Sequence, residues 1–113
     1  MSINQIQDEI IEEFSAFDDW MDRYSLLIEL GNDLEPFPET DRTDPNLIDG
    51  CQSKVWFTAE TQTTAEGKVV IYHGDSDAIL VKGIVALLIR VLSGHTAQEI
   101  VDANLYFIEQ INL

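Results

Sequence analysis

The thiol of Cys51 is the side chain in this sequence best suited to covalent chemistry, and it is the one cysteine among 113 residues. It lies in the segment Asp49–Lys54, where a proline-containing loop leads into a predicted strand, a kind of position that often carries reactive groups. Gly50 leaves room beside the sulfur. Lys54 favours the thiolate, whereas Asp49 and the negative charge of the chain oppose it. A lone cysteine can equally be a small buried apolar residue, so both interpretations stay open.

The possible partners of this thiol limit the chemistry. Hydrolysis by a Cys–His pair needs a base within hydrogen-bond reach and a third, orienting group. The two histidines are His73, near the end of a predicted strand, and His95, between two predicted helices. A histidine at the end of a strand, such as His73, is more often a partly exposed cap, and His95 in a helix connection more often serves a linking or dipole role, so the sequence does not favour a catalytic triad. It also has no close-spaced ligand pair for zinc. Thiol–persulfide exchange demands less, because a thiolate takes a sulfur already activated on a donor, without a proton relay.

A second polar segment, Gly74–Ala78, precedes a long apolar run. Ser76 or Asp75 is expected to cap the helix that follows, and Asp77 in its first turn suits the helix dipole. A calcium loop is disfavoured because the acids stop after two. A phosphate site is disfavoured because two like charges would face the anion. Contact between exposed aspartates and a basic partner remains open.

The composition excludes several classes of protein. With 21 acidic against 6 basic residues, the formal charge is −15. The chain therefore lacks the cations that nucleic acids and anionic membranes require, and a basic protein partner fits better. A lone cysteine makes no internal disulfide, and the first residues do not resemble a signal peptide. The apolar run 79–92 is shorter than a membrane span. We therefore expect a single domain, residues 1–113, in the cytoplasm.

Hydrophobic spacing predicts helices at about residues 3–15 and 19–31, although one bent helix would also fit. The second helix is expected to end with Gly31 in the C′ position. Residues 34–49 hold all three prolines and predict a loop that is functional or mobile. Trp20, Tyr24 and Trp56 are interpreted as core.

The segments 54–61 and 68–73 predict a hairpin. It needs support from a third strand near residues 46–48 or from a helix on one face. The run 78–92 is apolar on nearly all sides and is expected at the centre of the core. Shorter helices are predicted through about residue 103 and over 106–113. The fold class is therefore α+β.

Two segments of the sequence form longer motifs. Residues Gly50–Trp56 read GCQSKVW, and residues Gly74–Leu87 read GDSDAILVKGIVAL. These motifs resemble the signatures GCQSxVW and GDSDAxLVKGLxALL of the SufE family of sulfur-accepting proteins. Further likeness lies in the helix around residues 20–31 and the turn and helix 96–100, so that the resemblance runs in order from about residue 18 to 104.

This resemblance implies a SufE/IscU-like two-layer sandwich, with a small antiparallel sheet packed against helices. Cys51 would accept a persulfide from a SufS-like cysteine desulfurase and relay it toward iron–sulfur scaffold components, stimulating the desulfurase. Pyridoxal phosphate would reside on that partner, and this chain would need no cofactor or metal. It would be a sulfur carrier rather than a free-standing enzyme. The alternative is an acidic regulatory module that binds a desulfurase without transferring sulfur. The docking surface is expected to comprise Asp49, Gly50, Gln52, Ser53, Lys54, Asp75, Asp77 and Lys82.

The sequence departs from the family pattern at its end. Family members usually continue into a segment with His, Ser and Arg and then a long helix, and the family's arginine near the acceptor cysteine has no counterpart here. We therefore expect an apolar patch beside the last helices, filled by self-association or by a partner. Monomer and homodimer both stay open.

Overall fold

The computed structural model describes residues 1–48 and 52–111. Over these residues it shows an α+β sandwich in which helices pack against a two-stranded antiparallel sheet. In chain order the elements are α1 (Ile3–Ser15), α2 (Trp20–Asn32), the 3₁₀ turns η1 (Glu39–Asp41) and η2 (Asp44–Asn46), β1 (Val55–Thr64), β2 (Gly67–Ser76), α3 (Ile79–Leu92), α4 (Ala97–Asp102) and α5 (Phe107–Gln110). None of the helices described is long and apolar enough to cross a membrane.

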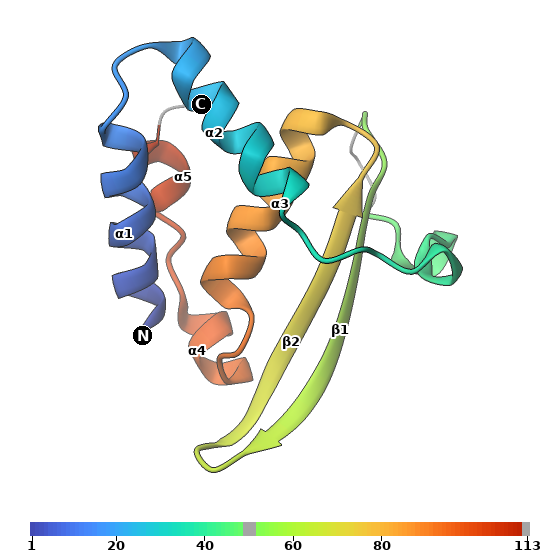
Figure 1. Cartoon of the computed structure of the whole chain (residues 1–113). Helices are drawn as coiled ribbons and strands as arrows, with labels where there is room; N and C mark the ends of the chain where they lie inside the picture. Colours follow the sequence, from blue (N-terminus) through green and yellow to red (C-terminus); the bar gives the residue numbers. More distant parts are fainter. Residues whose placement is uncertain (49–51, 112–113) are drawn as a thin grey trace.

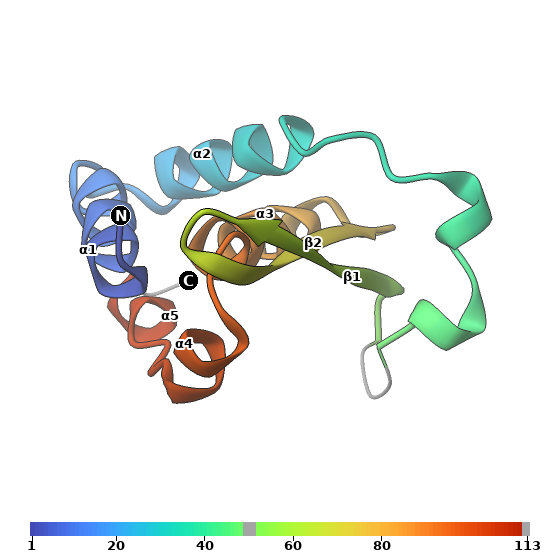
Figure 2. The ribbon, with the colours of Figure 1, turned by 90° about the horizontal axis from the view of Figure 1, so that it is seen from below.

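Helix α3 lies between the hairpin and helices α1, α2 and α5 (Figures 1 and 2). Helices α1 and α5 lie together on the side of α3 away from the strands, and α2 crosses α3 near its beginning. Helix α4 follows the end of α3 and contacts β2. The predicted helices at 3–15 and 19–31 are confirmed as separate elements, each within a residue of the observed bounds. Ser2 and Asp19 cap them by accepting hydrogen bonds from backbone N–H groups of their first turns.

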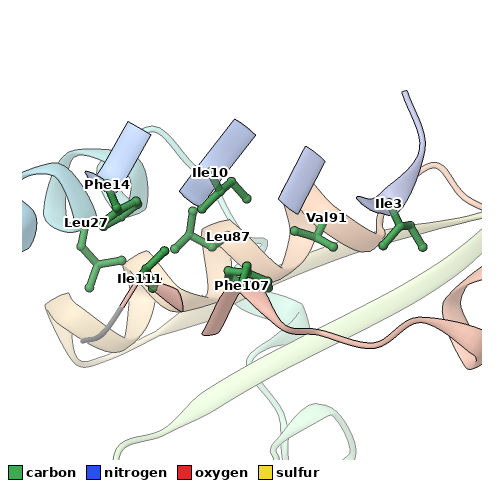
Figure 3. Packing of buried hydrophobic residues seen from close by; sticks show 8 residues of the cluster. All are labelled: Ile3, Ile10, Phe14, Leu27, Leu87, Val91, Phe107 and Ile111. Atoms are coloured by element: carbon green, nitrogen blue, oxygen red, sulfur yellow. The ribbon is translucent and has the colours of Figure 1, made fainter. Parts of the chain in front are cut away.

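The main hydrophobic core is formed where α1, α2, α3 and α5 meet (Figure 3). It contains Ile3, Ile10, Phe14, Leu27, Leu87, Val91, Phe107 and Ile111. The α1 members follow one another at helical spacing, which is the pattern from which this helix was predicted. Helix α3 contributes only part of its surface to the core. Ile79 and Ile84 are exposed, so the prediction that α3 is buried on most sides is wrong at its beginning.

Two aromatic residues of α2 also differ from expectation. Trp20 is 46% exposed and Tyr24 is 39% exposed, so neither is a core residue. The apolar stripe correctly indicated a helix, but the structure covers only its later part, around Leu27 and Gly31. Trp56 is half-buried at the start of β1.

Gly31 was expected to end α2, but it lies inside the helix, at the point where α2 crosses α3. A Cβ on Gly31 would come within 2.9 Å of the backbone nitrogen of Gly83. A Cβ on Gly83 would come within 2.3 Å of the carbonyl oxygen of Leu27. The two glycines thus allow the backbones to approach more closely than any side chain would permit.

The hairpin is longer than predicted and its register is continuous. Val55 pairs with Ser76 at one end and Thr64 pairs with Gly67 at the other. Gly67, at the turn, has a φ of 115°, which only glycine adopts without strain. The third strand expected near residues 46–48 is reduced to a single bridge between Leu47 and Trp56. The support comes mainly from α3, which packs on one face of the hairpin.

Residues 33–48, here called the strap, connect α2 to the start of β1 and include both 3₁₀ turns. Figure 1 shows the strap crossing the hairpin before it reaches η1 and η2. Phe37 in the strap is only 7% exposed, so the strap is anchored by apolar burial as well as by the polar contacts described below.

Near the end of the described chain, Val101 on α4 and Ile108 on α5 are exposed. They lie where the sequence predicts an apolar patch. Its occupation by a second copy or a partner stays a prediction.

Candidate functional site

The segment with the predicted acceptor cysteine is held at its entry. The N–H of Ile48 donates to the carbonyl of Val55 over 2.8 Å, next to the Leu47–Trp56 bridge. The strap is therefore tied to β1 immediately before residue 49. Residues 49–51, and with them the predicted site residues Asp49, Gly50 and Cys51, lie outside the described residues.

The exit of the same segment is tied to the corner between β2 and α3. The N–H of Lys54 donates to Oδ1 of Asp77 over 2.9 Å, and the N–H of Asp77 donates to the Lys54 carbonyl over 3.1 Å. The hydroxyl of Ser76 donates to the same carbonyl over 2.8 Å. The two segments singled out in the sequence, 23 positions apart at Lys54 and Asp77, therefore meet in the fold.

The expected cap of α3 is replaced by these contacts. The N-cap position is Ala78, and no side chain caps the helix there. Ser76 accepts a hydrogen bond from the N–H of Ala78 just before the helix starts. Asp77 is engaged with Lys54 rather than with the first turn. Both residues thus organise the corner instead of the helix terminus.

Asp75 is buried at the centre of an ion-pair cluster that joins three elements. Its Oδ2 accepts from Nε and Nη2 of Arg42 over 3.0 and 2.6 Å, and its Oδ1 lies 3.5 Å from Nζ of Lys82. The strap, β2 and α3 are therefore joined through one carboxylate that is 5% exposed. Asp75 is therefore buried rather than exposed as expected, and the half-buried Lys82 lies beside it.

The electrostatics of Asp75 favour its ionised form. Burial is the largest single influence on the Asp75 pKa and acts to raise it. Hydrogen bonds from Arg42 and from the backbone of Ser76, with the positive charges of Lys82 and Arg42, act in the opposite direction and prevail. The pKa of Asp75 is therefore lowered, and the cluster is charged at neutral pH.

Arg42 was not identified from the sequence, although it is the strongest partner of Asp75. It also pairs with Glu39, and its guanidinium lies 6.0 Å from the centre of the Phe37 ring. Arg42 is the only cation between residues 33 and 48 of a strongly acidic sequence. An isolated arginine among acids was the available signal, but its partner is 33 residues away in the chain.

The described site residues differ in accessibility. Gln52, Lys54 and Asp77 are exposed, and Ser53 and Lys82 are half-buried. The exposed residues thus carry both charge signs at the corner where residues 52–54 meet β2 and α3.

Neither histidine is part of a recognisable triad among the described residues. His73 lies inside β2, not at its end, with Nδ1 3.4 Å from Glu35 and Nε2 3.9 Å from Glu60. His95 is buried, and its Nε2 lies 3.0 Å from the carbonyl oxygen of Met1. Within residues 1–48 and 52–111, no group of three or more His, Asp or Glu side chains is arranged to hold a metal ion.

Comparison with known proteins gives a consistent result. The family model SufE, described as an Fe-S metabolism associated domain, matches residues 8–113. An uncharacterised SufE-like protein of Rhizobium meliloti is 42% identical over 93 residues, which are 82% of this chain and 66% of that protein. A SufE-like protein of Synechocystis sp. is 45% identical over 105 residues, 93% of this chain and 64% of that protein. The chain thus spans slightly less than two thirds of the length of these relatives.

Proposed function

This chain belongs to the SufE family, which is associated with Fe–S metabolism, and on that premise we propose that it is a sulfur acceptor that works through Cys51. In the proposed step, the Cys51 thiolate attacks the terminal sulfur of a persulfide on a donor enzyme. A new S–S bond forms on Cys51 as the donor's S–S bond breaks, and the donor cysteine leaves as a thiolate. The exchange needs no external oxidant or reductant.

The observation that carries this proposal is the double attachment of the polypeptide on either side of residues 49–51. Ile48 is bonded to Val55 before the segment, and Lys54 is bonded to Asp77 and Ser76 after it. A cysteine that must meet a second protein benefits from anchored flanks, because less conformational entropy is lost on docking. Gln52, Lys54 and Asp77 are exposed where the segment ends and offer polar groups to a partner.

The donor we propose is a SufS-like, pyridoxal-phosphate-dependent cysteine desulfurase in the cytoplasm, with Fe–S scaffold components as recipients. The cofactor would stay on that enzyme. Lys82 is paired with the buried Asp75, which supports a structural role for it rather than a Schiff base. In this scheme the chain is a carrier that increases the turnover of its partner by removing the product sulfur.

The direct test is mass spectrometry of the intact protein after incubation with a cysteine desulfurase and cysteine. We expect the chain to gain one sulfur atom, and Cys51→Ser to gain none. Because Cys51 is the one cysteine, the adduct needs no further assignment. Absence of both the adduct and any stimulation of the desulfurase would contradict the proposal.

The alternative function, an acidic module that regulates a desulfurase by binding alone, is favoured only by the net charge of −15. Cys51→Ser separates the two functions. An acceptor loses stimulation in this variant, whereas a pure binding module keeps all of it.

The docking surface can be tested at Asp77. Asp77→Asn keeps an oxygen that can accept from Lys54, so it removes charge with little change in the corner. If Asp77 faces a basic partner, the variant should bind a few-fold more weakly at low salt, and less so at high salt. Glu66→Gln in the exposed hairpin turn is the matched control. Equal binding of wild type and Asp77→Asn at every salt concentration would exclude Asp77 from the contact.

A further inference from the structure

Strand β1 has one open edge. On one side it pairs with β2 over its whole length. On the other side, among the described residues, only its beginning meets the strap, through the bond from Ile48 to Val55, the Leu47–Trp56 bridge and contacts with η2. Figures 1 and 2 show this outer side of the hairpin facing away from the helices, with the strap passing near it. A long open edge is a template for another strand.

The backbone groups on that edge follow from the register. The carbonyl of Val55 accepts from Ile48, so Val55 points away from β2. Because direction alternates along a strand, the N–H and C=O groups of Phe57, Ala59, Thr61 and Thr63 point the same way. The opposite strand gives an independent check. Val70, the partner of Thr61, points outward too, since it is bonded to His95 on the other edge of the hairpin.

These outward groups are unused within the described part of the chain. Among residues 1–48 and 52–111, no backbone hydrogen bond outside the β1–β2 ladder involves Phe57, Ala59, Thr61 or Thr63. Natural edge strands are commonly blocked by proline, lysine or a bulge. The segment Val55–Thr64 contains no proline or lysine, and its register has no bulge. Seven consecutive positions, 57–63, extend for about 20 Å and suffice for strand pairing.

The surroundings of this edge select a partner by charge. A groove of about 620 Å³ lies between the strap and β1, lined by Glu35 and Asp41 of the strap and by Thr58–Glu60 of β1. Glu60 and Glu35 both approach His73, so their carboxylates lie on the same face of the hairpin. No lysine or arginine lines the groove. A second copy of the chain would bring another charge of −15 to this acidic edge.

We propose that the open edge of β1 binds an extended, basic peptide segment of a partner protein by strand addition. Backbone hydrogen bonds to Phe57, Ala59, Thr61 and Thr63 supply the pairing. Every second side chain of the peptide projects on the face that carries Glu60, where lysine or arginine meets Glu60 and Glu35. This surface is independent of Cys51 and of sulfur transfer.

The probe is a synthetic, end-capped heptapeptide of alternating valine and lysine with a fluorescent label. We expect saturable binding to the full chain by fluorescence anisotropy, weakened by salt, and amide NMR shifts concentrated at residues 57–63. Two further peptides are N-methylated at alternate positions, one at the valines and one at the lysines. Only one set of N–H groups can face β1, so one peptide should lose at least about tenfold in affinity and the other should bind normally.

Variants of the protein test the same edge. Thr61→Pro removes an outward N–H but no bond to β2, and should weaken binding about tenfold, whereas Thr61→Ala should have little effect. Glu60→Lys should weaken binding a few-fold, with Glu66→Lys in the turn as the charge control. If Thr61→Pro disturbs folding, the two methylated peptides still decide the question.

Three results would overturn the proposal. The first is absence of binding at millimolar peptide. The second is equal binding of both methylated peptides, which would indicate charge attraction without strand pairing. The third is a wild-type dimer that Thr61→Pro converts to a monomer in sedimentation, which would assign the edge to a second copy. Cys51→Ser should bind the peptide as wild type does, so this outcome does not depend on sulfur acceptance.

Discussion

Asp75→Asn should destabilise the protein at neutral pH, because it removes the charge that joins the strap, β2 and α3. The variant keeps the size of the side chain and one acceptor oxygen. Arg42 then donates two hydrogen bonds to a neutral amide instead of a carboxylate. The new NH₂ group also faces the ammonium of Lys82, which approaches Oδ1 to 3.5 Å in the wild type.

The magnitude follows from these contacts. A hydrogen bond to a charged group contributes about 1 kcal/mol more than a neutral one, so the two bonds from Arg42 account for about 2 kcal/mol. The unfavourable approach of Lys82 adds up to about 1 kcal/mol. Arg42 is 30% exposed and keeps its contact with Glu39, so the loss should stay below the roughly 3–5 kcal/mol of a fully buried pair. We expect about 2–3 kcal/mol.

The pH dependence distinguishes this cause from a packing defect. The pKa of Asp75 is lowered in the folded state. Its stabilising contribution is therefore fully present above the unfolded value of about 3.9 and is lost as the pH falls through the folded value. The difference between wild type and Asp75→Asn should be constant from pH 7 to about 5 and then shrink below about pH 4.

Urea unfolding followed by tryptophan fluorescence, at several pH values, measures this difference. Asp18→Asn is the control, since Asp18 is exposed and makes no ion pair with a described residue. The reasoning fails if Asp75→Asn is as stable as wild type at pH 7. It also fails if the difference is as large at pH 3 as at pH 7, because the charge would then not be its source.

Two further substitutions test the packing that positions the site. Gly83→Ala should lower the free energy of unfolding, measured in urea, by about 1–2 kcal/mol. The clash of the new Cβ with Leu27 outweighs the gain of about 1 kcal/mol in helix propensity. A stabilised variant would show that α2 and α3 separate at little cost. Gln7→Ala should cost about 2–3 kcal/mol in the same assay, since fully buried Gln7 donates to the carbonyl of Asn104 over 2.9 Å and accepts from the N–H of Phe107 over 3.1 Å. Wild-type stability of that variant would mean that water replaces both bonds.

The bounds of α1 and α2 could be predicted because the signals are local. Apolar residues recur at helical spacing, and Ser2 and Asp19 stand where caps are needed. The exposure of Trp20 and Tyr24 could not be predicted in the same way. A stripe identifies the apolar face of a helix, but the length of that face that is covered depends on where a neighbouring helix crosses it.

Some features of the candidate site could likewise be predicted from consecutive residues, whereas others could not. Its cysteine and both motifs are recognisable from consecutive residues. The role of Asp75 is not, because a residue read as a helix cap or an exposed contact is instead buried against Arg42, 33 positions away. The open edge of β1 also required the tertiary structure. Two runs of strand-forming residues on either side of a polar turn predicted a hairpin, but only the tertiary structure shows that, among the described residues, most of one side of β1 has no neighbouring strand.

Local order in this protein is therefore a property of its sequence, through periodicity, caps, turn residues, net charge and the motif around Cys51. Other contacts were decided by the tertiary structure. The contact between Lys54 and Asp77 continues the β1–β2 register beyond Val55 and Ser76, so it depends on the pairing of the two strands. The cluster of Asp75, Arg42 and Lys82 forms where the strap and α3 meet the end of β2. The physical reason is that each such contact depends on side-chain volume and charge at two distant positions at once. No single stretch of sequence contains both.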